Sequence, residues 1–228
     1  MITAPPLNKT IARDGIMRNM DNLYENLFQT TYFDNKNIYM IANNKKIGNI
    51  AQINKLQLNS DSIVIRFGGD KYNLEEKIIK NRTDIMVYRS NKTHFNNCNK
   101  YNKKGKIKLF IWWDNARQPD NKRYIDKNSY AKSFINQMNY FDQKHVKVGF
   151  ISSKYNKDGT KSPTQGFGVL INLIEKTKYK KIVLIGFTNL TRDNIKINKK
   201  FGCHYIYYEN QYFKNVILKK YKNIHTMG

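Results

Sequence analysis

The sequence has few cysteines, few acidic residues and no long apolar run. Its two cysteines, Cys98 and Cys203, lie far apart without metal-ligand spacing, which argues against a zinc site or a disulfide framework and favours a reducing compartment. No stretch approaches the roughly 20 apolar residues of a membrane-spanning helix. The first residues lack the apolar middle of a signal peptide. We therefore expect a cytoplasmic protein, with attachment to a membrane surface left open.

The shortage of acidic residues makes the chain strongly basic. Seventeen Asp and Glu stand against 41 Lys and Arg, which gives a formal net charge of +24 over 228 residues. Such a charge attracts nucleic acid, an anionic membrane or an acidic or phosphorylated substrate. Lys and Asn are scattered along the whole chain, as an AT-biased genome would also produce. The charge alone therefore selects none of these partners.

Hydrophobic residues make up 40% of the chain, and their pattern alternates between strands and helices. Short apolar runs predict strands at 38–42, 61–67, 84–88, 106–113, 146–151 and 181–187. Helical spacing predicts helices at 73–80, 129–141, 164–177 and 209–221, with a short one near 17–28. We expect an α/β fold: a single Rossmann-like domain over residues 37–228, with a mostly parallel sheet flanked by helices, after an N-terminal extension of residues 1–36.

Polar and small residues follow the predicted strands. Asn43 and Asn44 end the first strand, and Arg66, Phe67 and Gly68 end the second. In a parallel sheet such ends form one edge, where ligands bind. Turn residues have the same composition, so the pattern marks a place and does not identify a ligand.

The segment from Ser162 to Gly168 is more specific because it leads from a polar loop into an apolar helix. Ser162 or Thr164 is placed to cap the helix, with Gln165 and Gly166 in its first turn. A helix start with exposed N–H groups suits an anion, although a routine cap looks the same. No GKS or GKT follows, so this is not a Walker motif.

His204 lies five residues before Glu209, close to the start of the last predicted helix. Neutral imidazole is a natural general base near pH 7, although a histidine in an aromatic stretch also fits a structural role. No Asp-x-Asp follows a predicted strand, so we expect no metal site.

Together these segments resemble the animal-type sialyltransferases and, more distantly, the bacterial sialyltransferases of the same fold. The long sialylmotif is similar to IYMIANNKKIGN, DSIVIRFGGD and KNRTDIMVYRSN here, and the short one to SPTQGFGVLINLI followed by KKIVLIGFTN. The very short motif, His-x-x-x-x-Glu, is present as His204 to Glu209. The motifs keep their order over residues 38–215.

The resemblance implies a GT-A-like sialyltransferase variant, which is a metal-independent, inverting glycosyltransferase without a cofactor. It would transfer a 2-keto sugar acid, with sialic acid favoured, from a CMP-linked donor to a glycan hydroxyl. His204 would be the base and Glu209 would brace its helix. The donor would be bound by residues of the long and short motifs: Asn43, Asn44, Arg66, Gly68, Ser162, Thr164, Gln165 and Gly166.

The chain departs from the family pattern at several points. Asn43 replaces the usual Gly, and Gly68 stands where the family has Asn. The third motif is not identified in residues 188–202. Cys98 and Cys203 are not placed for the disulfide of the animal enzymes. These departures bear on the identity of the donor sugar more than on the class of reaction.

Three alternatives stay open. The donor could be CMP-Kdo, another CMP-linked 2-keto acid. The charge and interleaved aromatics are compatible with a nucleic-acid-binding protein, although no binding motif favours it. The fold could also bind a glycan or a protein without catalysing transfer.

Overall fold

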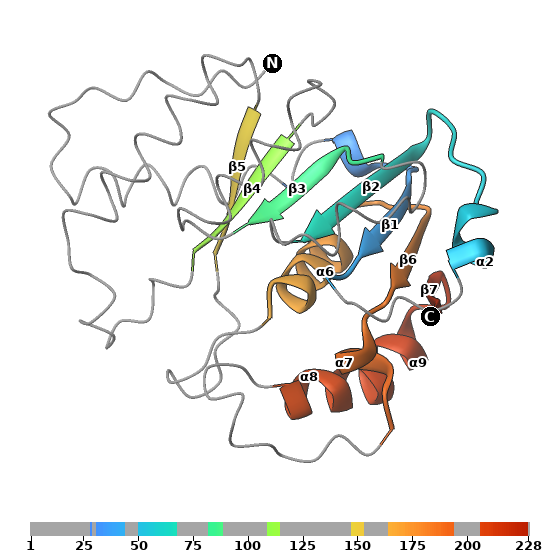
Figure 1. Cartoon of the computed structure of the whole chain (residues 1–228). Coiled ribbons are helices and arrows are strands. Elements are labelled where there is room, and N and C mark those ends of the chain that lie inside the picture. The colour runs from blue at the N-terminus through green and yellow to red at the C-terminus, as the bar shows by residue number, and fades with distance from the viewer. Residues whose placement is uncertain are drawn as a thin grey trace, which may run out of the picture.

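The structure is a computed structural model that describes residue 28 and residues 31–43, 50–67, 82–88, 109–114, 147–152, 164–193 and 206–227 (Figure 1). In this part of the chain seven strands form one sheet. The strands are β1 (Asn37–Ile41), β2 (Ser62–Phe67), β3 (Ile85–Tyr88), β4 (Leu109–Asp114), β5 (Lys147–Ser152), β6 (Lys181–Ile185) and β7 (Ile224–Met227).

Every pair of neighbouring strands in the sheet is parallel, and the strand order is β5-β4-β3-β2-β1-β6-β7. The chain moves outward from β1 to β5 on one side, then returns to place β6 and β7 on the other. β1 therefore pairs with β2 on one side and with β6, far along the chain, on the other. The strand order reverses between β1 and β6.

Helices lie beside this sheet (Figure 1). The described helical segments are η1 (Thr31–Phe33), α2 (Ile50–Asn54), α6 (Gln165–Lys176), α7 (Thr188–Thr191), α8 (Ile206–Tyr212), the π-helical η6 (Phe213–Ile217) and α9 (Leu218–Lys220). The segments α8, η6 and α9 follow one another without a break. The fold is therefore α/β, with a parallel sheet and flanking helices.

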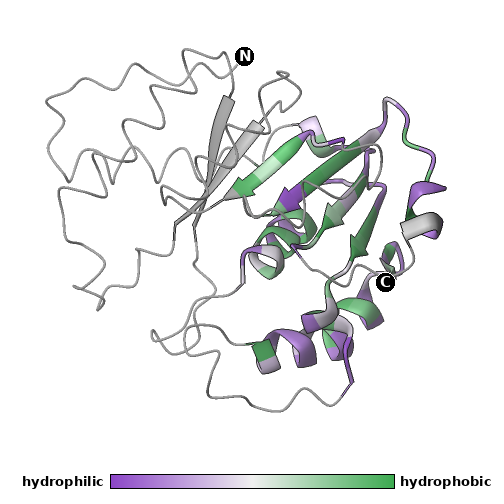
Figure 2. Cartoon of the chain, in the orientation of Figure 1, coloured by the Kyte–Doolittle hydropathy of each residue, from purple (hydrophilic) through white to green (hydrophobic). Residues whose placement is uncertain are grey.

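Two apolar clusters form because side chains alternate between the faces of each strand. On one face Ile38 and Met40 of β1 pack with α6 and with Phe213 and Ile217 of η6. On the other face Tyr39 and Ile41 pack with Ile53 of α2. Figure 2 shows the central strands in green, with a purple stretch at the arrowhead of β2, the end that carries Arg66.

The predicted strands agree with the structure to within a few residues for β1, β2, β3, β4, β5 and β6, and so does the predicted helix at α6. The predicted helix 209–221 is observed at 206–220. The expected helices at 73–80 and 129–141 and all but the end of 17–28 lie outside the described residues. Short α2, α7 and β7 were not predicted.

The last residues of the expected N-terminal extension pack against the sheet. Phe28 and Phe33 are 1% and 0% exposed, and their rings stack at 5.5 Å between centroids. Both belong to the apolar cluster on the α6 face. The backbone N–H of Asn35 donates to the carbonyl of Lys178 before β6 (2.9 Å). The boundary after residue 36 stays a prediction.

Candidate functional site

The carboxyl ends of β1 and β6 are neighbours at the point where the strand order reverses. In open α/β sheets this is the place where ligands bind. The N–H of Ala42, just after β1, donates to the carbonyl of Ile185 (2.9 Å), so the two ends stay together. Gly186 follows β6 with a φ of 72°, a conformation that favours glycine.

The N-terminus of α6 lies at the same edge. Because α6 ends at Lys176 and β6 begins at Lys181, the helix runs back along the sheet and starts beside the strand ends. Gly166 faces the ring of Phe187, so closely that a Cβ at position 166 would overlap the ring. Phe187 in turn meets Phe67 of β2 edge to face, with 5.7 Å between centroids.

Thr164 is the N-cap of α6 in an extended conformation, with φ −63° and ψ 151°. Its Oγ1 accepts a hydrogen bond from the N–H of Phe167 (3.4 Å), the usual bond of an N-cap threonine. The N–H of Gly168 donates to the Thr164 carbonyl (3.0 Å). The N–H groups of Gln165 and Gly166 fall in the first turn, where a helix has no acceptor of its own to offer.

Glu209 of α8 binds this cap with both carboxylate oxygens. The N–H of Thr164 donates to Oε1 (2.6 Å), and its hydroxyl donates to Oε2 (2.6 Å). In a capping box this role belongs to a Glu or Gln three residues after the cap. Here that position is Phe167, and a glutamate from another helix takes its place.

Glu209 is deeply buried, with 1% of its surface exposed. Burial raises its pKa from 4.5 to about 7, against the lowering effect of the two hydrogen bonds from Thr164. No cation among the described residues lies within ion-pair distance of this carboxylate. The group therefore titrates near neutral pH and takes its polar contacts from Thr164.

Asn210, the next residue, fastens α8 to α7. It is 1% exposed, and its Nδ2 lies within hydrogen-bond distance of three carbonyls: those of Asn189 (3.2 Å), Leu190 (2.8 Å) and Arg192 (3.1 Å). Sequence reasoning did not single out this residue. The start of α8 is thus held on one side by α6 and on the other by α7.

Arg66 is placed differently from these residues. It lies two residues after Val64 on β2 and so shares the face of Val64, which is opposite α6. Its side chain is 1% exposed, and its Nε donates to the carbonyl of Arg82 (3.1 Å). Burial lowers its pKa from 12.5 to about 10. The structure does not bring Arg66 into contact with Thr164.

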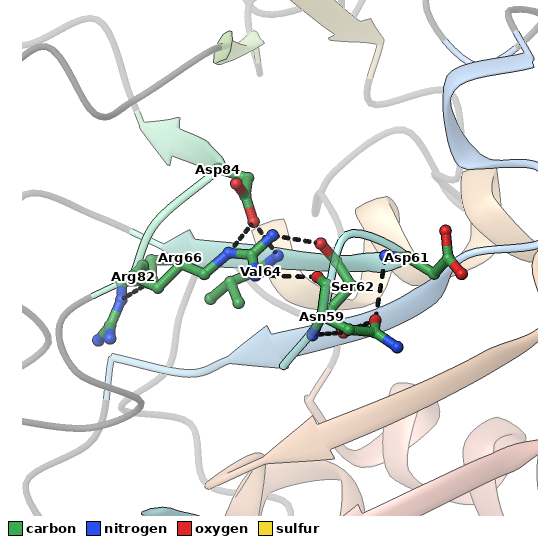
Figure 3. A network of polar contacts seen from close by, with 7 residues as sticks. All are labelled: Asn59, Asp61, Ser62, Val64, Arg66, Arg82 and Asp84. Carbon is green, nitrogen blue, oxygen red and sulfur yellow. Dashed lines mark hydrogen bonds and ion pairs between the residues drawn. The ribbon is translucent and has the colours of Figure 1, made fainter. Parts of the chain in front are cut away.

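A polar network joins the start of β2 to the start of β3 (Figure 3). Asp84 accepts from the backbone N–H of Val64 (2.9 Å) and from Nε of Arg82 (2.9 Å). The Arg82 guanidinium also donates to the carbonyls of Ser62 (2.6 Å) and Asn59 (3.1 Å). The network therefore extends the β2–β3 ladder beyond the first paired residues, Ile65 and Ile85.

The remaining predicted site residues divide into two groups. Asn43 is described, half-buried, just after β1, and Gln165 lies in the first turn of α6. Among the side chains described at this edge, the amide nitrogen of Gln165 is shielded from solvent and has no hydrogen-bond partner. The other predicted residues lie outside the described part of the chain: Asn44, Gly68, Ser162 and His204.

Phe67 and Phe187 were also missed as site residues, although both lie in segments that define the edge. The sequence signal that could have identified them is their position: Phe67 ends an apolar strand, and Phe187 follows one. No group of three His, Cys, Asp or Glu side chains that could hold a metal occurs among the described residues. Independence from metal stays a prediction.

No helix in the described part of the chain combines the length and the apolarity needed to cross a membrane. Comparison with protein-family models and with curated protein sequences finds no match for this chain. What can be said of function therefore rests on the motifs and on the geometry above.

Proposed function

We propose that the chain is a Rossmann-like, GT-A-like sialyltransferase variant that transfers a 2-keto sugar acid from a CMP-linked donor to a glycan hydroxyl. The observation that carries this proposal is the pair of 2.6 Å bonds between Thr164 and Glu209. One residue belongs to the segment that resembles the short sialylmotif, and the other ends the segment that resembles the very short motif. A family relationship requires that such segments meet, while a chance likeness does not.

Two further contacts support the proposal. Gly166 and Phe187, which belong to the two parts of the segment that resembles the short motif, pack together. Phe187 also touches Phe67, which belongs to the long one. All lie at the carboxyl edge, beside the reversal of strand order where a nucleotide fits best.

The proposed roles follow from the chemistry of the transfer. As the acceptor oxygen attacks the anomeric carbon, His204 takes its proton, and the bond from that carbon to the CMP phosphate breaks with both electrons leaving on CMP. Negative charge then grows on the phosphate. First-turn N–H groups of α6, at Gln165 and Gly166, are suited to meet this charge. The bonds that Asn210 donates to carbonyls in and just after α7 and the two that Glu209 accepts from Thr164 would hold the helix that follows His204.

Nucleotide screening by thermal shift tests the donor class. We expect CMP, CMP-sialic acid or CMP-Kdo to raise the melting temperature, because a ligand at 100 times its Kd stabilises by about 2.7 kcal/mol. A preference for UDP or GDP would overturn the proposal. Transfer assays with CMP-sialic acid and CMP-Kdo then separate the two donors.

Replacement of the proposed base tests the reaction. His204→Gln is expected to lower kcat by about 10²- to 10⁴-fold while CMP still raises the melting temperature. His225→Gln is a matched control because His225 is exposed on β7. Near-full activity in the His204 variant would exclude it as the base. If the wild-type protein binds CMP but transfers no sugar to any acceptor, the chain would be a non-catalytic relative.

The pH dependence of CMP binding tests whether the phosphate of CMP lies near Glu209. A carboxylate next to the α6 N-terminus repels an incoming phosphate unless it carries a proton, and burial raises its pKa to about 7. CMP affinity should therefore fall as pH rises through about 7. The affinity of Glu209→Gln should fall less over the same range, and titration calorimetry of both proteins measures the difference. Parallel profiles would place the phosphate elsewhere.

A further inference from the structure

The amino edge of the sheet, opposite the candidate site, carries a cluster of exposed lysines. Because all strands are parallel, the turns that precede β1, β6 and β7 meet at this edge. Six exposed lysines lie at the end of α6, in α9 and in the turns that lead from these helices into β6 and β7, and we call them the lysine edge: Lys176, Lys178, Lys180, Lys219, Lys220 and Lys222.

Backbone contacts hold the turns of the lysine edge together. The N–H of Lys180 donates to the carbonyl of Lys36 (3.0 Å), and the N–H of Asn35 to that of Lys178 (2.9 Å). Nδ2 of Asn223 donates to the Lys180 carbonyl (3.1 Å), which ties the two lysine-bearing turns to each other. The six ammonium groups therefore project from neighbouring, fixed backbone.

Few acidic groups oppose this charge. Asp61 is bonded to Lys36 (2.9 Å), and Asp34 accepts from the N–H of Lys178 (3.1 Å). Glu175, in the last turn of α6, is a further acid beside these lysines. The lysine edge thus keeps a large positive excess, which attracts an anionic surface within the screening length of about 10 Å at 0.1 M salt.

The character of the lysine edge fits lipid headgroups better than nucleic acid. Its six cations are lysines, which act as point charges and lack the planar fork of arginine. The rings of Tyr179 and Tyr221 pack against the core, and Nζ of Lys220 lies 5.2 Å from the centroid of the Tyr221 ring, which leaves less of these rings for stacking with a base. Val216 is 39% exposed and lies one turn before Lys219 and Lys220, which adds an apolar group beside the charges.

We infer that the lysine edge docks the protein on an anionic lipid membrane. Each lysine near such a surface adds attraction that falls away with salt. Because the lysine edge and the candidate site lie at opposite edges of the sheet, docking leaves the carboxyl edge facing away from the lipid. This inference goes beyond the proposed transfer reaction and does not depend on it.

Vesicle co-sedimentation tests the inference. We expect the protein to sediment with phosphatidylglycerol-containing vesicles at low salt, to stay in solution with pure phosphatidylcholine, and to be released at roughly 0.5 M salt. The variant Lys178→Gln/Lys180→Gln/Lys219→Gln/Lys222→Gln should bind anionic vesicles at least about tenfold more weakly. Its melting temperature should match that of the wild type, since these side chains are exposed.

A second quadruple variant separates the effect of the lysine edge from the effect of the total net charge. Lys45→Gln/Lys46→Gln/Lys154→Gln/Lys157→Gln removes the same number of charges from segments that follow the carboxyl ends of β1 and β5 in the sequence. It should lose much less vesicle affinity than the lysine-edge variant. Equal losses, no binding to anionic vesicles, or lysine-dependent binding to single-stranded RNA in place of vesicles would each overturn the inference.

Discussion

The two edges of this parallel sheet stabilise their polar groups in different ways. At the amino edge the charged groups at the starts of β2 and β3 neutralise one another, with Asp84 bonded to Arg82 and to the backbone of Val64. At the carboxyl edge Glu209 is buried against a hydroxyl and an amide of Thr164. Burial shifts Glu209 toward its protonated form, against the lowering effect of the two hydrogen bonds that it accepts from Thr164. The contacts at the carboxyl edge should therefore respond to pH near neutrality.

The largest expected effect is at the amino edge. Asp84→Ala leaves the buried N–H of Val64 and the guanidinium of Arg82 without this acceptor, so we expect a loss of about 4 kcal/mol in the free energy of unfolding. Urea denaturation measures it. Asp61→Asn is the control, because the Lys36–Asp61 pair is exposed and should contribute little. Similar losses in both variants would remove the distinction between buried and exposed pairs.

At the carboxyl edge the expected effect of Glu209 depends on pH. The folded protein holds this proton more tightly than the unfolded chain, because burial raises the pKa from 4.5 to about 7. The free energy of unfolding should therefore decrease as pH rises through this interval, by about 3 kcal/mol in total.

Urea titrations from pH 4.5 to pH 8 of wild type and Glu209→Gln measure this contribution as a difference in slope, since other groups titrate in both proteins. The glutamine variant should show the flatter profile. Glu175→Gln, on the exposed side of α6, should keep the wild-type slope. A Glu209→Gln profile that is parallel to wild type would contradict the burial argument.

A smaller effect is expected where α6 meets β6. Gly166→Ala places a methyl group against the Phe187 ring and should cost about 2 kcal/mol by overpacking. Phe187→Leu makes room, so the double variant should lose less than the sum of the single losses. Thermal melting of the wild type, the two single variants and the double variant completes this double-mutant cycle. If the losses in melting temperature add, there is no steric conflict between the methyl group at position 166 and the Phe187 ring.

The smallest effect is expected at the α6 cap. Thr164→Ala removes the side-chain acceptor for the Phe167 N–H, a long bond of 3.4 Å, and the hydroxyl donor to Oε2 of Glu209, and should cost about 1.5 kcal/mol. Thr164→Ser keeps the hydroxyl and should keep most of the stability. If serine is as destabilising as alanine, the methyl group and not the hydroxyl matters here.

Sequence patterns predicted most of the described strands because continuous apolar runs are typical of strands covered on both faces, as in β1, β2 and β6. They did not predict the strand order, since pairing of β1 with β6 depends on contacts between distant segments. Short α7 and β7 have only four residues each, which is too few for a periodic signal.

For the candidate site, the sequence predicted several of the residues but not the contacts between them. Ser162 or Thr164 was predicted to cap the helix from its place at the helix start, and the family resemblance implied that Glu209 braces its own helix. That each is the other's partner could not be read from the sequence, because 45 positions separate them. The bond from Arg66 to the Arg82 carbonyl likewise joins residues 16 positions apart, so no local pattern predicts it.

The pairing of β1 with β6 also has a consequence for synthesis on the ribosome. The residues that complete one side of β1, Lys181–Ile185, are made more than a hundred residues after it. Until then one edge of β1 offers unpaired N–H and C=O groups among apolar side chains, which is a template for intermolecular pairing. A ribosome-bound chain ending before residue 181 should therefore aggregate on release or recruit chaperones, while one that includes β6 can close its sheet.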